Sequence, residues 1–251
     1  MFNDSFPAYY GRVNNRSQNT YLGLKYQLSK IDSYLESSFY EITRPDFGKN
    51  VRICNNGCVD TVFDTGAYYR AEGEMNFLKN LIKDRVSIGG GIRYIHSNLT
   101  DNNRYSYLIH YDSKSFGPQF SIRLRTKEFG GFFFSFALDL FYLRGSILNR
   151  VHNLYQYSPG GYYEYSTRNN SIYRGTEFEV AANYCLTESI VITGGLQLIN
   201  ARVIPNSKDV ISNDSIHDLN QNFRSRANAN YYDSLSTIYL QITLRNSKSL
   251  F

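Results

Sequence analysis

The chain has 251 residues, a net charge of +5 and an aromatic content of 16%, all of it from 23 Tyr and 17 Phe residues. The mean hydropathy is −0.42, and no apolar run approaches the ~18 residues that a membrane-spanning helix needs. The basic residues are scattered, which argues against a nucleic-acid partner. Because Tyr, Phe, Thr, Val and Ile favour strands and no segment resembles a linker, we expect one all-β domain over residues 1–251.

The N-terminal segment, residues 1–20, has no basic start followed by an apolar run. A signal peptide would show that pattern, so we expect a mature chain from which a signal peptide has been removed. A first strand is predicted at 7–13, partly because an up-and-down membrane barrel needs an even strand count.

Nine further segments alternate apolar and polar residues with the period of two that a strand imposes. They are 21–28, 33–43, 67–77, 86–94, 119–125, 132–142, 177–184, 192–198 and 237–244. The alternation is clearest in 237–244. In 33–43 two registers fit, and we prefer the one with Leu35 and Phe39 on the apolar face and Glu36 on the polar face. Together these segments predict about ten antiparallel strands.

The polar faces of these strands hold full charges in mid-strand, five basic and five acidic. A narrow soluble core would not readily bury them, because unpaired buried charge is costly, whereas a barrel lumen that is wet or laced with ion pairs could. The predicted lumen-lining residues are Lys25, Arg70, Glu72, Glu74, Arg93, Arg123, Arg125, Asp139, Glu177, Glu179, Gln197 and Gln241.

The apolar faces would then contact lipid. The predicted lipid-facing residues are Leu22, Leu24, Ile88, Ile92, Phe120, Ile122, Leu124, Phe134, Phe136, Leu138, Leu140, Val180, Leu196 and Ile242. Aromatic residues near strand ends suit the interfacial girdles of such barrels. The candidates are Tyr26, Tyr69, Tyr94, Phe132, Tyr142, Tyr184 and Tyr239, although Tyr239 falls on the polar face.

The connections alternate in length. Short links are predicted at 29–32, 78–85, 127–130 and 187–189, and long polar loops at 45–60, 99–116, 147–170 and 204–230. Within 147–170 a turn signal at 158–161 flanked by tyrosines predicts strands that extend beyond the membrane. Outer-membrane barrels have short periplasmic turns and long extracellular loops, so the sequence predicts a transmembrane antiparallel up-and-down β-barrel in a bacterial outer membrane. The alternative is a soluble β-barrel carrier, in which both faces would be reversed.

The three cysteines are Cys54, Cys58 and Cys185. Cys54 and Cys58 could close a small disulfide in an oxidising compartment. A metal site is less favoured, because no second Cys or His pair follows at zinc-like spacing, and no cofactor is expected. Cys185 is predicted to be a small buried hydrophobe.

Several stretches resemble the central strand pair of the major outer-membrane proteins of Legionella and Chlamydia. A Gly-rich approach at 116–118 is followed by a strand at 120–125, a Gly-Gly-Phe turn at 130–132 and a Leu-Arg-Gly end at 143–145. Residues 175–198 are similar to a later hairpin of that type. The resemblance implies a porin-like surface protein.

Three functions follow as hypotheses. The first is a porin-like narrow channel for small solutes, and the second is a closed barrel that acts as a structural or adhesive surface module. The third is an omptin-like rim protease, for which the nearest candidates are His110 with Asp112 and His217 with Asp218; neither pair reproduces the omptin arrangement, so we predict that the chain is not an enzyme. Expected partners are outer-membrane lipid and lipopolysaccharide, and small solutes or host and surface ligands bound through the extracellular loops.

Overall fold

The structure, a computed structural model, describes the backbone of residues 18–54, 58–103, 107–153, 163–205 and 231–244. Side chains are described for 19–28, 30–43, 67–100, 110–148, 168–205 and 232–244. The strand predicted at 7–13 therefore lies outside the described residues.

Nine long strands follow one another in the described ranges. They are β1 (Gln18–Leu28), β2 (Ser33–Cys54), β3 (Cys58–Ile82), β4 (Val86–Asn103), β5 (Tyr107–Arg125), β6 (Phe132–Asn153), β7 (Tyr163–Cys185), β8 (Ile190–Pro205) and β9 (Tyr231–Leu244), with one 3-10 turn, η1 (Ser29–Ile31). Each strand pairs antiparallel with the next, in the order β1 to β9. The prediction of an all-β, antiparallel, up-and-down fold is confirmed. No helix in the described ranges is long and apolar enough to cross a membrane.

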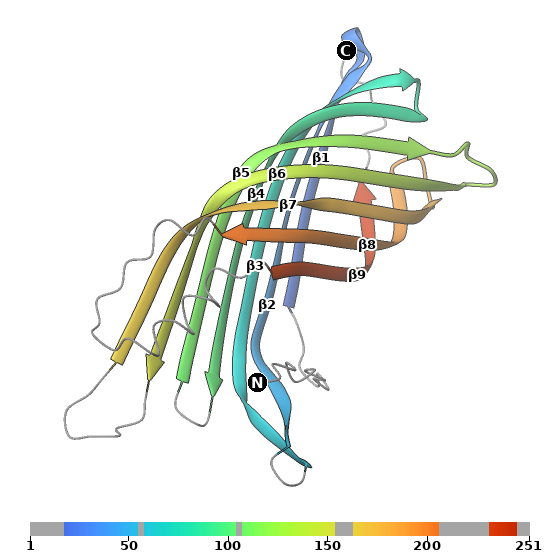
Figure 1. Cartoon of the computed structure of the whole chain (residues 1–251). Helices are drawn as coiled ribbons and strands as arrows, with labels where there is room; N and C mark the ends of the chain where they lie inside the picture. Colours follow the sequence, from blue (N-terminus) through green and yellow to red (C-terminus); the bar gives the residue numbers. More distant parts are fainter. Residues whose placement is uncertain (1–17, 55–57, 104–106, 154–162, 206–230, 245–251) are drawn as a thin grey trace.

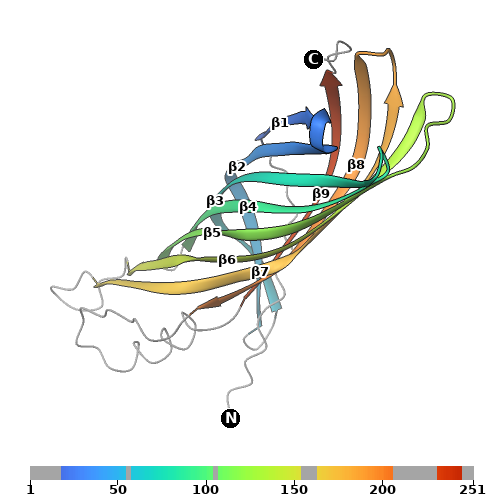
Figure 2. The ribbon, with the colours of Figure 1, turned by 90° about the horizontal axis from the view of Figure 1, so that it is seen from above.

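The sheet is strongly twisted and curls into part of a barrel (Figures 1 and 2). Its convex face points outward and its concave face encloses an interior. The curl brings neighbouring backbones close together at concave positions occupied by glycine. A Cβ added at Gly145 would lie 1.9 Å from the carbonyl oxygen of Lys114, and one at Gly91 would lie 1.9 Å from that of Met75. Any larger residue there would push the strands apart.

Short turns connect the strands at one end of the sheet. The connections β1–β2, β3–β4, β5–β6 and β7–β8 leave between three and six residues outside the strands. The β5–β6 turn contains Gly130 and Gly131, both with positive φ, a conformation that glycine adopts without steric cost. Asp32 and Asp84 take the same left-handed region in two of the other turns.

The loops predicted at 45–60, 99–116 and 147–170 are mostly strand, which corrects the sequence analysis. Strands β2 and β3 continue to Cys54 and Cys58, and β4 and β5 continue to Asn103 and Tyr107. Strands β6 and β7 continue to Asn153 and Tyr163. The link predicted at 78–85 is also shorter, because β3 runs to Ile82. The sequence analysis missed these extensions because their residues are mostly polar. Backbone groups continue to pair there after the apolar alternation has ended.

The two faces of the sheet differ in composition. On the convex face the large apolar side chains are exposed, among them Leu22 and Leu24 at 70% and Ile238 at 87%. On the concave face a second apolar cluster is buried. We call it the inner apolar layer, and its buried members are Ile95, Phe141, Leu143, Ile147, Tyr173, Ile199, Ala201 and Val203. The interior therefore holds apolar as well as charged residues.

Candidate functional site

An ion-pair chain crosses the interior next to the inner apolar layer. The Arg93 guanidinium from β4 contacts the carboxylates of Glu72 on β3 and Glu177 on β7. Arg93 is 1% exposed. Strands β4 and β7 are not neighbours in the sheet, so the Arg93–Glu177 contact spans the interior rather than running along one strand pair.

Arg70 extends this chain toward the sheet edge. Its guanidinium lies 2.9 Å from the Glu72 carboxylate and 2.6 Å from that of Asp233 on β9. The Tyr173 hydroxyl donates to Asp233 and accepts from Arg70 at 3.3 Å. Arg70 has an exposure of 0%, and an unpaired charge in that position would be strongly destabilising. We call Arg70, Glu72, Arg93, Glu177 and Asp233 the inner charge layer.

A second ionic group lies closer to the short turns. Arg123 on β5 is 2.8 Å from the Glu36 carboxylate on β2 and 2.7 Å from that of Asp139 on β6. Because β2 and β5 are three strands apart, this group also spans the interior.

Neutral polar side chains donate further hydrogen bonds to interior acceptors. The Gln119 amide donates to Glu74 at 2.8 Å and to Asn76 at 2.7 Å. The Gln197 amide donates to Glu177, and the Tyr239 hydroxyl donates to Glu179. Buried polar groups are hydrogen-bonded in native proteins, and this network is what makes so many interior charges tolerable.

The inner charge layer packs directly on the inner apolar layer. The Arg93 guanidinium carbon lies 4.6 Å from the centre of the Phe141 ring, and Phe141 stacks on Tyr173 at 5.6 Å between ring centres. Arginine over an aromatic ring gains cation–π attraction. The two layers therefore fill the interior along the central strands.

A hollow remains where the two edge strands face each other. It has a volume of about 1380 Å³ and is lined by β1 and β9 residues together with Glu72, Arg93, Glu177 and Glu179. A smaller hollow of about 300 Å³ lies near Arg123 and the short turns.

Comparison with known proteins identifies the family of this chain. Residues 5–249 match the family model described as "Predicted outer membrane protein, Leptospiraceae". This chain belongs to that family. The match agrees with the predicted location in a bacterial outer membrane, whereas the resemblance to Legionella and Chlamydia proteins stays a prediction.

No curated protein matches this Leptospiraceae-family chain. Among solved structures, the siderophore receptor PiuA from Acinetobacter baumannii is similar at 10% identity and a TM-score of 0.38. The alignment covers 92% of this chain and 40% of the receptor.

All twelve residues predicted to line a lumen lie on the concave strand positions of this outer-membrane protein. The Lys25 ammonium sits 3.7 Å from the centre of the Tyr34 ring. Arg125 lies over the Phe133 ring at 3.7 Å and is 3.5 Å from the Glu128 carboxylate. The structure thus brings most of the predicted charges together in the interior, whereas Lys25 and Arg125 lie near the short turns.

Interior residues that the sequence analysis did not single out are Tyr40, Tyr173 and Asp233. Tyr173 and Asp233 lie in parts of β7 and β9 that precede the apolar alternation at 177–184 and 237–244, so no hydrophobic contrast marked them, whereas Tyr40 lies within the predicted strand 33–43. The available signal was parity, since Tyr173 is in step with Glu177 on β7 and Asp233 with Tyr239 on β9. Continuing the period of two would have placed all three inward.

The fourteen residues predicted to face lipid lie on the convex positions. We call the apolar side chains of this face the outer apolar belt. On β6 it runs from Phe132 to Tyr142, both more than 40% exposed. The girdle candidates Tyr26, Tyr94 and Tyr184 are exposed on the same face, while Tyr239 points inward.

The histidine candidates for catalysis are not paired as the alternation suggested. His110 contacts the Thr100 hydroxyl at 3.2 Å, and Asp112 pairs with His96 at 2.7 Å. His96, which the sequence analysis missed, also meets the Tyr69 ring edge-on. His217 and Asp218 lie outside the described residues. Within the described ranges no group of three His, Cys, Asp or Glu side chains is placed to hold a metal ion.

The three cysteines lie in two separate places in the fold. Cys54 and Cys58 are opposite each other in the β2–β3 ladder, but their side chains lie outside the described residues, so the disulfide stays a prediction. Cys185 was predicted to be buried and is only half-buried, with its thiol 3.7 Å from the Glu128 carboxylate. Its position at the end of β7, beside the exposed turn, explains the difference.

Proposed function

We propose that this chain is a transmembrane outer-membrane β-barrel of about ten strands, with an interior closed by the two inner layers, which acts as a surface-exposed module. The short turns would face the periplasm and the extended hairpins the outside. The supporting observation is the set of ion pairs that cross the interior, Arg93 to Glu177 and Arg70 to Asp233.

The outer apolar belt supports the membrane topology. A transmembrane strand needs about 9–11 residues, which the belt on β6 supplies over 132–142. On β4 and β5 the belt covers 86–94 and 116–124. A soluble barrel would not place Leu24, Phe134 and Leu240 at 50–79% exposure on one continuous face.

Strand direction supports a tenth strand. In an antiparallel series of nine, β1 and β9 run the same way, so direct closure would make one parallel pair. Single-chain bacterial outer-membrane barrels have even strand numbers. A strand drawn from the chain outside the described ranges, such as that predicted at 7–13, would run opposite to both edges and close the barrel with antiparallel ladders.

Barrel size supports a closed interior. Eight strands enclose a space just wide enough for side chains to fill, and about ten add little to it. Here Arg70, Arg93 and Phe141 occupy that space and are each at most 4% exposed. A wide pore is thus disfavoured.

A narrow channel is the second candidate, and the hollow of about 1380 Å³ beside β1 and β9 favours it. Its lining combines Lys25 and Arg93 with Glu72 and Glu179. Such a mixed lining would suit small polar solutes rather than one ion sign.

We further infer that the chain is not an enzyme. The partly exposed pair of His96 with Asp112 lies at the convex surface and resembles an ordinary surface ion pair. The omptin-like reading gains no support from the described residues.

The test is to refold the chain into bilayers, compare boiled and unboiled migration on a gel, and record single-channel conductance from the same sample. A mobility shift without conductance steps supports the closed barrel, and a shift with defined steps supports the channel. The Phe141→Ala variant is the matched comparison. Removing that ring opens the inner apolar layer, so if the wild type is closed, the variant should show conductance steps that the wild type lacks. A chain that stays folded and soluble without detergent contradicts the membrane topology.

A further inference from the structure

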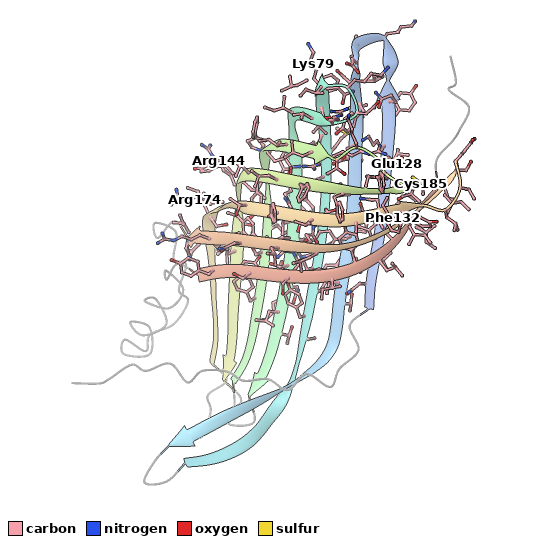
Figure 3. The ribbon with its side chains drawn as sticks, turned by 90° about the vertical axis from the view of Figure 1, so that its right-hand side faces the viewer. Lys79, Glu128, Phe132, Arg144, Arg174 and Cys185 are labelled. Atoms are coloured by element: carbon pink, nitrogen blue, oxygen red, sulfur yellow. The ribbon has the colours of Figure 1, made fainter. Side chains whose placement is uncertain are left out.

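A row of basic side chains borders the outer apolar belt on the side of the extended hairpins. It consists of Lys114 on β5, Arg144 on β6, Arg174 on β7 and Arg202 on β8. We call it the basic row. Figure 3 shows Arg144 and Arg174 near each other and pointing away from the ribbon, with Phe132 at the opposite end of the sheet.

The strand register makes the row continuous. Arg174 and Arg202 are direct cross-strand partners. Arg174 pairs with Tyr142 and is therefore diagonal to Arg144, and Lys114 is diagonal to Arg144 in the same way. Directly opposed residues have Cβ atoms about 4.5–5.5 Å apart and diagonal ones about 7–8 Å.

Among the described residues, Arg144, Arg174 and Arg202 lack the carboxylate partners that the interior arginines have. Within the described ranges no carboxylate pairs with Arg144, Arg174 or Arg202, and no convex position of β6 to β9 with a described side chain is acidic. Two like charges directly opposite each other are destabilising. The Nε–H of Arg202 is also buried without a hydrogen-bond acceptor, and a buried unsatisfied donor is costly.

A groove lies beside the Arg174–Arg202 pair. It has a volume of about 700 Å³, and its lining includes Phe120, Leu140, Tyr142, Arg174, Arg202 and Tyr232. Thr176 and Asn200 also line the groove. Their side chains are smaller than the aromatic rings on either side, which leaves a depression between those rings. The site thus offers a shallow, open apolar groove on the belt side and two guanidinium groups at its rim.

We propose that the basic row, with Arg174 and Arg202 at its centre, binds the phosphorylated headgroup of an outer-leaflet lipid whose acyl chain lies in the groove. Guanidinium groups bind phosphate by paired, charge-assisted hydrogen bonds. A phosphate between Arg174 and Arg202 would cancel their repulsion. The Arg202 Nε–H, which is buried in this conformation, would gain an acceptor once the side chain turns toward that phosphate. A free phosphate would satisfy the same charges but would leave the groove empty, so the observations favour the lipid. The site rests on the proposed membrane topology, which puts the belt in the bilayer and the row at its surface.

The experiment uses the full chain folded in a phosphate-free maltoside detergent, titrated calorimetrically with short-chain phosphatidic acid. The R174Q/R202Q variant should bind it about thirtyfold more weakly than wild type, since each basic residue near an anionic lipid surface contributes about 1 kcal/mol. R174K/R202K, which keeps the charge, should retain most of the affinity. The matched control is K79Q/K83Q, which removes two exposed cations from the short-turn end and should change the affinity by less than threefold, which is about 0.6 kcal/mol.

Two further ligands identify the source of the phosphate. Diacylglycerol of the same chain length should bind weakly and equally to all variants, and inorganic phosphate should bind far more weakly than the lipid. The inference is overturned if R174Q/R202Q binds phosphatidic acid like wild type, if the control loses as much affinity, or if inorganic phosphate binds as tightly as the lipid.

Gel migration and bilayer insertion of the same samples separate the two proposals. Insertion of every variant, with unchanged lipid affinity in R174Q/R202Q, overturns the lipid site alone. Failure of the wild type to insert overturns the proposed function and this site with it.

Discussion

Arginine residues occupy both faces of this sheet in opposite circumstances. On the concave face Arg70, Arg93 and Arg123 each contact at least two carboxylates and are largely buried. On the convex face Arg144 and Arg174 are exposed, and no acidic partner lies among the described residues. The same residue type is used inside to hold strands together and outside to border an apolar surface.

The difference shows how environment decides what a charge does. Inside, desolvation makes an unpaired charge intolerable, so each guanidinium fixes the relative position of strands far apart in the sheet. Outside, at the edge of the outer apolar belt, the long aliphatic stem can cover apolar surface while the cation reaches water or headgroups. The following changes test this comparison.

Arg93→Leu should have the largest effect. It leaves Glu72 and Glu177 buried without their shared cation, so we expect a loss of about 3–5 kcal/mol in the free energy of unfolding. The folded band on unboiled gels across a urea series measures it. Arg144→Leu is the control from the other face and should change the free energy by no more than about 0.5 kcal/mol. Equal effects of the two substitutions would contradict the comparison.

Leu138→Arg tests the convex face in mid-belt. If that face contacts hydrocarbon, the variant should lose about 2–4 kcal/mol, and Leu148→Arg, on the same face of β6 beyond the belt, about 0–1 kcal/mol. The folded fraction in lipid vesicles measures both. Should Leu138→Arg fold as well as Leu148→Arg, the convex face would be a water-facing one.

Tyr173→Phe tests how the two inner layers are joined. The hydroxyl lies between Arg70 and Asp233, and losing a hydrogen bond to a charged group costs about 1.5–3 kcal/mol. Urea midpoints in detergent measure the loss. Tyr232→Phe, at an exposed convex position, provides the control and should stay within about 0.5 kcal/mol of wild type. A silent Tyr173→Phe variant would mean that the layers are energetically independent.

His96→Ala should have the smallest effect. The pair with Asp112 is about three-quarters shielded on each side chain but lies at the convex surface, so we expect a loss of at most about 1 kcal/mol. The same urea series measures it. A loss comparable to that of Arg93→Leu would indicate a structural role that the comparison of faces does not explain.

Much of the local structure could be predicted from the sequence. The period of two determines which side chains share a face, because successive strand residues point in opposite directions whatever the tertiary fold. It therefore placed Arg93 with Glu177, and Ile122 with Leu138, on common faces. For 33–43 it left two registers open, and the structure confirms the preferred one, with Glu36 inward beside Arg123. It failed at 45–60 and 99–116, where polar residues continue as strand and apolar contrast disappears.

Only the tertiary structure decided which of these residues meet. Alternation says that Arg93 and Glu177 share a face, but strands three apart come into contact only because the sheet curls tightly, as the close backbone approaches at Gly91 and Gly145 allow. The convex row of Lys114, Arg144, Arg174 and Arg202 likewise exists only through strand register, since its members are about thirty residues apart in the chain. Side-chain direction is a local property of the backbone, whereas pairing across an interior and alignment along a surface depend on curvature and register, which the whole sheet sets together.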